Sequence, residues 1–166
     1  MFRLNEVQEY SLVKDSWTLH SHVPAAVSGS SAVVLDDVMY NLGGFGASHS
    51  IMWCDLNFSF APNWNFMDLP NHSFKRSSLR EAFVLENKIV YFGPHEQNRT
   101  FVLEKEGDSE QLKVVREDKG FGLKRGAFNT ASCSLNNEIY AFETGNFENI
   151  YLYSLESGEW SLCYPE

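Results

Sequence analysis

Histidine is the residue type of this chain best suited to hold a metal ion, and the sequence has five of them. His20 and His22 lie two residues apart, which places both on one face of a strand. Two imidazoles with no cysteine or carboxylate partner nearby make a poor zinc site, because zinc takes three or four protein ligands. His49, His72 and His95 do not have metal-ligand spacing. We therefore expect no metal and no cofactor.

The three cysteines, Cys54, Cys133 and Cys163, contain no Cys-x-x-Cys pair. Cys54 and Cys133 fall in predicted strands, where buried and unreactive thiols are expected. An odd and sparse set of cysteines fits a reducing compartment better than a disulfide framework. Residues 1–6 also lack the apolar segment of a signal peptide, so we expect a cytoplasmic protein.

Two short motifs are similar to catalytic or phosphate-binding patterns. Asp36-Asp37 is a carboxylate pair, but Glu86-Asn87 and Asn136-Asn137 stand at the corresponding positions of an internal repeat, which indicates turn residues. Gly43-Gly44-Phe45-Gly46 resembles a glycine-rich phosphate loop, yet no Lys followed by Ser or Thr comes after it and no helix is predicted there. We therefore expect a protein that is not an enzyme.

The composition excludes several classes of protein. Of the 166 residues, 43% are hydrophobic and 21% are charged, so the chain can bury a core and does not have a disordered composition. Aromatic residues make up 14%, which favours strands. A formal charge of −9, with Lys and Arg scattered, argues against binding to nucleic acid or to an anionic membrane. No apolar run approaches the roughly 18 residues of a membrane span.

A repeat of 50 residues organises the chain. Segments 35–44, 85–94 and 135–144 align without a gap: each opens with Leu, continues with two turn-prone polar residues and then becomes apolar. This pattern predicts a hairpin with the polar pair in its turn. Two sets of equivalent positions are expected to be buried: Leu35, Leu85 and Leu135, and Met39, Ile89 and Ile139.

A second hairpin motif lies between these segments. Residues 10–17 match residues 153–160, with a step of seven residues from Tyr to Trp in both copies. A third copy contains Trp53 and Trp64, and a fourth, which has no Trp, pairs residues 100–103 with 112–115. Tryptophan is large enough to pack against a neighbouring unit. Three tryptophans are therefore expected to be largely buried: Trp17, Trp64 and Trp160.

Two hairpins in about 50 residues make a four-stranded unit, which is the size of a β-propeller blade. The residues resemble the kelch repeat: a strand of small residues, a strand ending in Gly43-Gly44, then Cys54-Asp55, and a Trp followed by Pro, as at Trp64 and Pro70. Only the first unit keeps the Gly-Gly pair. The resemblance implies an all-β fold, a kelch-type β-propeller segment of four-stranded antiparallel blades.

The expected division of the chain has four parts. Residues 1–22 form the outer strands of an incomplete blade, and whole blades follow at 23–70, at 71–120, which is degenerate, and at 121–166. Propellers hold about four to eight blades, so we expect an open rather than a closed arrangement with an uncovered blade face at each end. The missing inner strands would come from a longer native protein or a partner subunit, because a second copy offers the same outer half.

Two basic pairs, Lys75-Arg76 and Lys124-Arg125, recur 49 residues apart in the connections that enter two of the blades. In a blade whose strands alternate in direction, these connections share a face with the loops between the second and third strands. On an acidic protein such a patch suits an acidic peptide, and the alternative is that these are solvated charges. The expected partner-binding residues are Lys75, Arg76, His95, Gln97, Arg99, Lys124, Arg125 and Asn146.

The resemblance implies a non-enzymatic scaffold for protein–protein interactions. Kelch propellers commonly act as substrate adaptors of ubiquitin ligases or link to the cytoskeleton. A purely structural subunit of a large assembly is an alternative, and a substrate-binding domain of the F-box-associated type is another, since residues 7–17 resemble one. The expected partner is a protein, either an acidic peptide segment or a subunit that covers the open blade faces, with no nucleic acid and no membrane.

Overall fold

The computed structural model describes residues 4–46, 51–57, 63–69, 81–92, 99–120, 130–143 and 149–163. These residues form an all-β structure of antiparallel strands, arranged in one two-stranded and three four-stranded sheets. β1 (Leu4–Ser11) and β2 (Ser16–Val27) form the first hairpin. The described ranges contain no helix with the length and apolarity that crossing a membrane requires.

The three four-stranded sheets are named blades A, B and C. Blade A contains β3 (Ser31–Leu35), β4 (Val38–Leu42), β5 (Ile51–Asp55) and β6 (Asn65–Met67). Blade B contains β7 (Glu81–Leu85), β8 (Lys88–Phe92), β9 (Arg99–Lys105) and β10 (Leu112–Lys119). Blade C contains β11 (Thr130–Leu135), β12 (Glu138–Glu143), β13 (Ile150–Ser154) and β14 (Glu159–Cys163).

Three tight turns set the register of the inner hairpins, which are the pairs formed by the first two strands of each blade. Asp36-Asp37, Glu86-Asn87 and Asn136-Asn137 all have positive φ angles, from 47° to 66°. Two successive residues with positive φ give the turn whose twist matches a hairpin, and Asn and Asp tolerate this conformation better than most side chains. Leu35 accordingly pairs with Val38 across the first of these turns. The turns predicted from the repeat are confirmed at all three positions.

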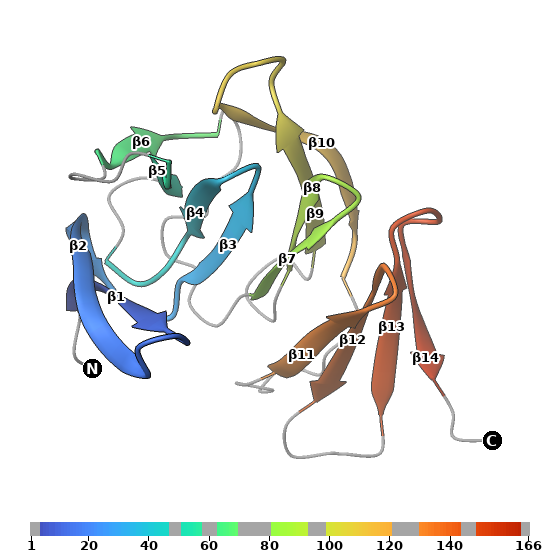
Figure 1. Cartoon of the computed structure of the whole chain (residues 1–166). Coiled ribbons are helices and arrows are strands. Elements are labelled where there is room, and N and C mark those ends of the chain that lie inside the picture. The colour runs from blue at the N-terminus through green and yellow to red at the C-terminus, as the bar shows by residue number, and fades with distance from the viewer. Residues whose placement is uncertain are drawn as a thin grey trace.

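The sheets follow one another around an open arc, from the first hairpin to blade C (Figure 1). Within each blade the strands lie in the order of the sequence, so β3, β7 and β11 are edge strands on the same side of their sheets. We call the face of a sheet that is turned toward the preceding sheet its leading face, and the opposite face its trailing face. The open arrangement of blade-like sheets is the one that the sequence predicts.

The hydrophobic core lies between the blades. Tyr40 on the trailing face of blade A packs in one cluster with Ile89 and Tyr91 on the leading face of blade B, and all three are completely buried. The alternate residues of β8, Val90 and Phe92, point to the other side and pack in a second cluster with blade C. Blade B is therefore covered on both faces, which explains why β8 is apolar at four successive positions.

The repeated leucines end the first strand of each blade, but they are not all buried. Leu35 and Leu85 are each 3% exposed, whereas Leu135 is 58% exposed. Leu35 packs in the cluster between blades A and B, and Leu85 in the cluster between blades B and C. The trailing face of blade C has no neighbour among the described residues. The predicted burial is thus wrong for Leu135, because burial here depends on the next blade.

The second set of repeated positions behaves in the same way. Ile89 and Ile139 are completely buried between two blades, while Met39 is only half-buried. Met39 lies on the leading face of blade A, where the preceding sheet is the two-stranded first hairpin. The sequence prediction holds for the two isoleucines and overstates the burial of Met39.

The three tryptophans differ for a similar reason. Trp160 is half-buried against blade B, and half-buried Trp64 donates its Nε1–H to Ser21 Oγ of the first hairpin at 3.3 Å. Trp17 is 67% exposed, because it lies on the leading face of the first hairpin, where no described sheet precedes it. The expectation that Trp17 is buried is therefore wrong.

One cysteine lies on a covered sheet face and another on an uncovered one. Cys54 is completely buried in β5, and burial, followed by the nearby Asp55 charge, raises the pKa of its thiol to about 11. Cys133 is exposed on β11, so the expectation of burial is wrong there. It occupies the trailing face of blade C, the same uncovered face that exposes Leu135.

The contacts of Trp160 predict a large difference between equivalent tryptophans. Its ring meets Phe92 edge to face at a centroid distance of 5.0 Å, and its Nε1–H donates to Thr100 Oγ1 at 2.8 Å. Trp160→Ala should lower the free energy of unfolding by about 3 kcal/mol. Trp17→Ala, the matched control, should change it by less than about 0.5 kcal/mol. Urea unfolding measures both, and equal losses would contradict the interblade role of Trp160.

Candidate functional site

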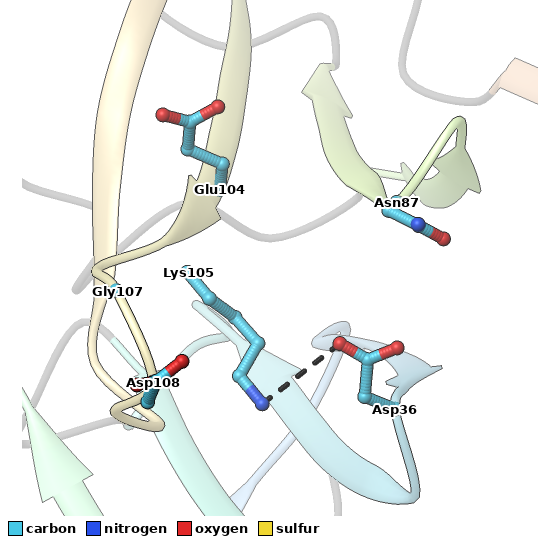
Figure 2. A pocket seen from close by; sticks show the side chains of 6 residues that line it. All are labelled: Asp36, Asn87, Glu104, Lys105, Gly107 and Asp108. Atoms are coloured by element: carbon cyan, nitrogen blue, oxygen red, sulfur yellow. Dashed lines mark ion pairs between the residues drawn. The ribbon is translucent and has the colours of Figure 1, made fainter.

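A polar pocket of about 570 Å³ lies beside the turns of blades A and B (Figure 2). The β3–β4 turn of blade A forms one side, and the β7–β8 turn and the β9–β10 hairpin of blade B form the rest. Its lining residues are Asp36, Asn87, Glu104, Lys105, Gly107 and Asp108. Lys105 is the one cation among these lining residues, so the pocket as a whole is acidic.

The Lys105 ammonium group is already paired. Its Nζ lies 2.8 Å from Glu110 Oε2 and 3.9 Å from Asp36 Oδ2, and Figure 2 shows the side chain extended toward Asp36. Glu110 also accepts a hydrogen bond from the Tyr40 hydroxyl at 3.2 Å. Burial of Tyr40, helped by the Glu110 charge, raises the pKa of this hydroxyl well above its usual range. The cluster therefore ties the turn of blade A to blade B and keeps the tyrosine protonated.

A second polar cluster lies between blades B and C. Arg116 Nε donates to Asp118 Oδ2 at 2.9 Å, and Arg116 Nη2 donates to the Tyr153 hydroxyl at 3.0 Å and to the Leu155 carbonyl at 2.6 Å. Tyr153 in turn donates to Asp118 Oδ2 at 2.6 Å. Burial and the Asp118 hydrogen bond raise the pKa of Tyr153 above its usual range. Each polar group of this cluster has a partner, so the cluster fixes how the two blades pack.

A groove of about 730 Å³ runs along the same boundary, between the end of β10 and the β13–β14 hairpin. At its edge Gly158 has a positive φ of 72°, and a Cβ atom there would come within 2.8 Å of the Asp118 carboxylate. Glycine therefore permits the close approach of the two blades at this point. The groove is lined by Glu117, Asp118, Lys119, Gly120, Tyr151, Ser157, Gly158, Glu159, Trp160 and Leu162.

Neither cavity assembles a nucleophile with a base. The buried hydroxyls of Tyr40 and Tyr153 stay protonated because their pKa values are raised. Within the described ranges, no group of three or more His, Cys, Asp or Glu side chains is placed to hold a metal ion. His20 Nδ1 lies 3.3 Å from the Oγ of the neighbouring Ser21. The two polar clusters hold adjacent blades together, through Tyr40 and Glu110 at one boundary and through Tyr153, Arg116 and Asp118 at the other.

The basic patch predicted from the sequence is represented by one described residue. Arg99 begins β9, is about half exposed, and forms an ion pair with Glu117 of the paired strand β10. That pairing offsets its positive charge on the surface. The other predicted partner-binding residues lie outside the described residues: Lys75, Arg76, His95, Gln97, Lys124, Arg125 and Asn146.

The strongest candidate surface is the uncovered leading face of the first hairpin, which includes Trp17, a residue expected from the sequence to be buried. On the leading face of the first hairpin Tyr10 is 40% exposed, Leu12 86%, Trp17 67% and Leu19 56%. Tyr10 and Trp17 are cross-strand partners whose ring centroids lie 5.1 Å apart. Contiguous exposed apolar side chains of this size mark sites of interaction with other proteins. The match between residues 10–17 and 153–160 was the signal that these residues belong to a packing surface.

No protein-family model matches this chain, and the comparison with curated proteins found no match either.

Removing the Tyr153 hydroxyl should weaken the contact between blades B and C. Tyr153→Phe removes the hydroxyl that bonds both the Asp118 carboxylate and the Arg116 guanidinium. Because the Asp118 side chain is only 10% exposed, water replaces the lost bond poorly. The expected loss in free energy of unfolding is about 1–3 kcal/mol. Tyr140→Phe is the control, because that hydroxyl only donates to Glu138 of its own strand and should cost less than about 0.5 kcal/mol. Equal effects of the two variants would remove the case for an interblade cluster.

Lys105 should stabilise the A–B boundary through its charge. Lys105→Met leaves Glu110 and Asp36 without their cation and should lower the free energy of unfolding by about 0.5–1 kcal/mol at low salt. High salt should shrink the loss, because it screens the carboxylates. Lys113→Met is the control, since its 3.5 Å pair with Glu104 is more exposed and lies within one blade. A loss that does not depend on salt would show that packing of the lysine stem, rather than charge, is responsible.

Proposed function

We propose that this chain is a non-enzymatic protein-binding scaffold of the kelch-propeller type that works in the cytoplasm. The kelch resemblance of the repeat and the open row of blade-like sheets support the class of protein. Three cysteines that are all free in the structure support a reducing compartment. The partner that we infer is a protein that covers an open blade face.

One observation carries this proposal. The leading face of the first hairpin exposes a row of apolar side chains, with Trp17 at 67% and Leu12 at 86%. In blade C the equivalent residues, Trp160 and Leu155, pack against another sheet. Contact of an apolar face with water costs free energy in proportion to the exposed apolar area. A protein that covers this face therefore binds with a favourable hydrophobic free energy.

Affinity capture with mass spectrometry tests the proposal. The tagged chain is expressed in cells as wild type, as Trp17→Lys and as Val115→Lys. Val115 is the matched control because it is 40% exposed on β10 of blade B, away from the two end faces. Proteins captured by the wild type and by Val115→Lys should be lost with Trp17→Lys, and circular dichroism should show that all three chains fold. Identical capture by all three chains would contradict binding through this face.

The basic patch is a separate route to a partner, and the same experiment distinguishes it. A chain with Arg76, Arg99 and Arg125 all changed to Ala should capture the same proteins as the wild type if the open face is the binding surface. Loss of capture in this variant, with capture retained in Trp17→Lys, would instead assign binding to the basic patch and to an acidic peptide.

A further inference from the structure

The first hairpin and the β13–β14 hairpin of blade C have the same conformation. Tyr10 pairs with Trp17 as Tyr153 pairs with Trp160. The ring centroids are 5.1 Å apart in both pairs, with interplanar angles of 48° and 43°. The turn residues that correspond, Asp15 and Gly158, both have positive φ angles, 48° and 72°. The surface that packs against a blade in one hairpin is therefore already formed in the other.

The surroundings of the two hairpins differ. Tyr153 is completely buried and Leu155 is 7% exposed, whereas their counterparts Tyr10 and Leu12 are 40% and 86% exposed. The surface that covers the β13–β14 hairpin of blade C is the trailing face of blade B. Its residues Val90, Phe92 and Val102 pack in one hydrophobic cluster with Tyr153 and Leu155. The structure thus shows what kind of surface a Tyr–Trp hairpin packs against.

An equivalent surface is uncovered at the other end of the molecule. Val90, Phe92, Thr100 and Val102 of blade B correspond, 50 residues later, to Tyr140, Phe142, Ile150 and Leu152 of blade C. Phe142 pairs with Ile150 and Tyr140 with Leu152, so the four side chains share the trailing face. All four are half-buried in their own sheet, and the exposed Leu135 lies on the same face. Among the described residues, one copy therefore has a hairpin with no blade over it and a blade with no hairpin over it.

Two exchanges of residue size make these two surfaces fit each other. Between blades B and C, Asp118 approaches Gly158 so closely that a Cβ atom at this position would lie 2.8 Å from the carboxylate and would require the Asp118 side chain to shift. In blade C, Cys163 occupies the place of Asp118, since it pairs with Ile150 as Asp118 pairs with Thr100. The first hairpin has Asp15 in place of Gly158. The aspartate is thus on the blade at the B–C boundary, as Asp118, but on the hairpin in the first hairpin, as Asp15. The corresponding position of blade C holds Cys163, which is smaller than aspartate.

The tyrosine hydroxyl changes partner in step with this exchange. Tyr153 donates to Asp118 of the neighbouring blade, at 2.6 Å. Tyr10 donates to Asp15 of its own hairpin. The first hairpin therefore needs no carboxylate from the surface it meets, and the trailing face of blade C offers Cys163 there.

We propose that two copies of this chain associate head to tail, with the first hairpin of one copy on the trailing face of blade C of the next. Tyr10 and Trp17 then lie over Phe142 and Ile150 as Tyr153 and Trp160 lie over Phe92 and Thr100. The contact joins two different surfaces, so further copies add in the same direction until a ring closes. It covers the outer part of each open face and supplies no inner strands to the first hairpin. The proposal rests on the proposed function and names a second copy as a partner.

Association is expected to strengthen with salt. Each copy carries a formal charge of −9, so copies repel at low ionic strength, while the proposed contact is largely apolar. Blade C also has Ser161 at the position where blade B has Arg116. The two positions correspond, since Ser161 pairs with Leu152 and Arg116 pairs with Val102. The ionic part of the B–C contact is therefore missing between copies.

A mixing experiment tests the head-to-tail arrangement. Trp17→Lys removes the hairpin surface and Ile150→Lys removes the blade surface, so each variant alone should have the mass of one chain in sedimentation or light scattering. Mixed one to one, they should form a dimer and nothing larger, because one intact hairpin meets one intact blade. The wild type should form larger species as concentration rises, and Val115→Lys should behave as the wild type. Circular dichroism verifies folding, and Leu152→Lys, at a half-buried position of the same face on the outer strand β13, replaces Ile150→Lys if that variant does not fold.

A disulfide provides an independent readout of the register. In the Cys133→Ser background, Asp15→Cys should form a bond between copies with the native Cys163 under mild oxidation, because the corresponding pair, Gly158 and Asp118, lies in direct contact. Mass spectrometry of the linked peptides identifies the bond, and adding Cys163→Ser should abolish it. A bond that joins the two introduced thiols of the Asp15→Cys variant to each other would instead indicate a symmetric dimer through two first hairpins and overturn the proposal.

The outcomes separate this inference from the proposed function. A wild type that keeps the mass of one chain at every concentration and salt level overturns head-to-tail association. If Trp17→Lys still loses captured proteins in that case, the first hairpin binds a different protein and the proposed function stands. If copies associate as proposed and capture does not depend on Trp17, the inference stands and the surface serves self-association alone.

Discussion

The three four-stranded sheets of this protein carry apolar side chains on both faces, and this constraint governs the rest of the structure. A β-strand sends alternate side chains to opposite sides, so a sheet with two apolar faces needs a neighbour on each side. Blade B satisfies this requirement, with Ile89 and Tyr91 packed toward blade A and Val90 and Phe92 toward blade C. The end sheets do not, and the exposure of Trp17 and Leu135 follows directly.

Polar clusters fix how the blades meet. Packing of apolar faces is non-directional, so it tolerates sliding of one sheet over another. The Tyr40 hydroxyl bonded to Glu110 at the A–B boundary, and the Tyr153 hydroxyl bonded to Arg116 and Asp118 at the B–C boundary, add hydrogen bonds that have one geometry. Both clusters involve a buried tyrosine whose pKa is raised, Tyr40 or Tyr153. The residues that line the two polar cavities therefore include residues that hold neighbouring blades together.

The inner and outer hairpins of the blades differ in how constant their turns and strand register are. The inner hairpins use tight turns such as Asp36-Asp37 to hold a strict register, which keeps the 50-residue repeat constant. The outer hairpins vary in turn length and contain a register shift, as between Val114 and Arg116. The outer hairpins also differ in their turn residues, since Asp15 of the first hairpin stands where blade C has Gly158. A repeat can thus keep its fold while its successive boundaries become non-equivalent.

The sequence by itself determined the strands, the turns and their register, because these depend on local chemistry: positive φ at polar pairs and alternation along a strand. It also determined the period of 50 residues and the open arrangement of four-stranded sheets. Burial at the ends was decided only by the tertiary structure. Leu135 and Leu85 stand at the same position of the repeat, before a turn of two polar residues, yet one is exposed and the other buried, since coverage comes from a neighbouring blade. The partner of the Arg116–Asp118 pair was equally unpredictable, because Tyr153 lies 37 residues from Arg116 and meets it only through sheet packing.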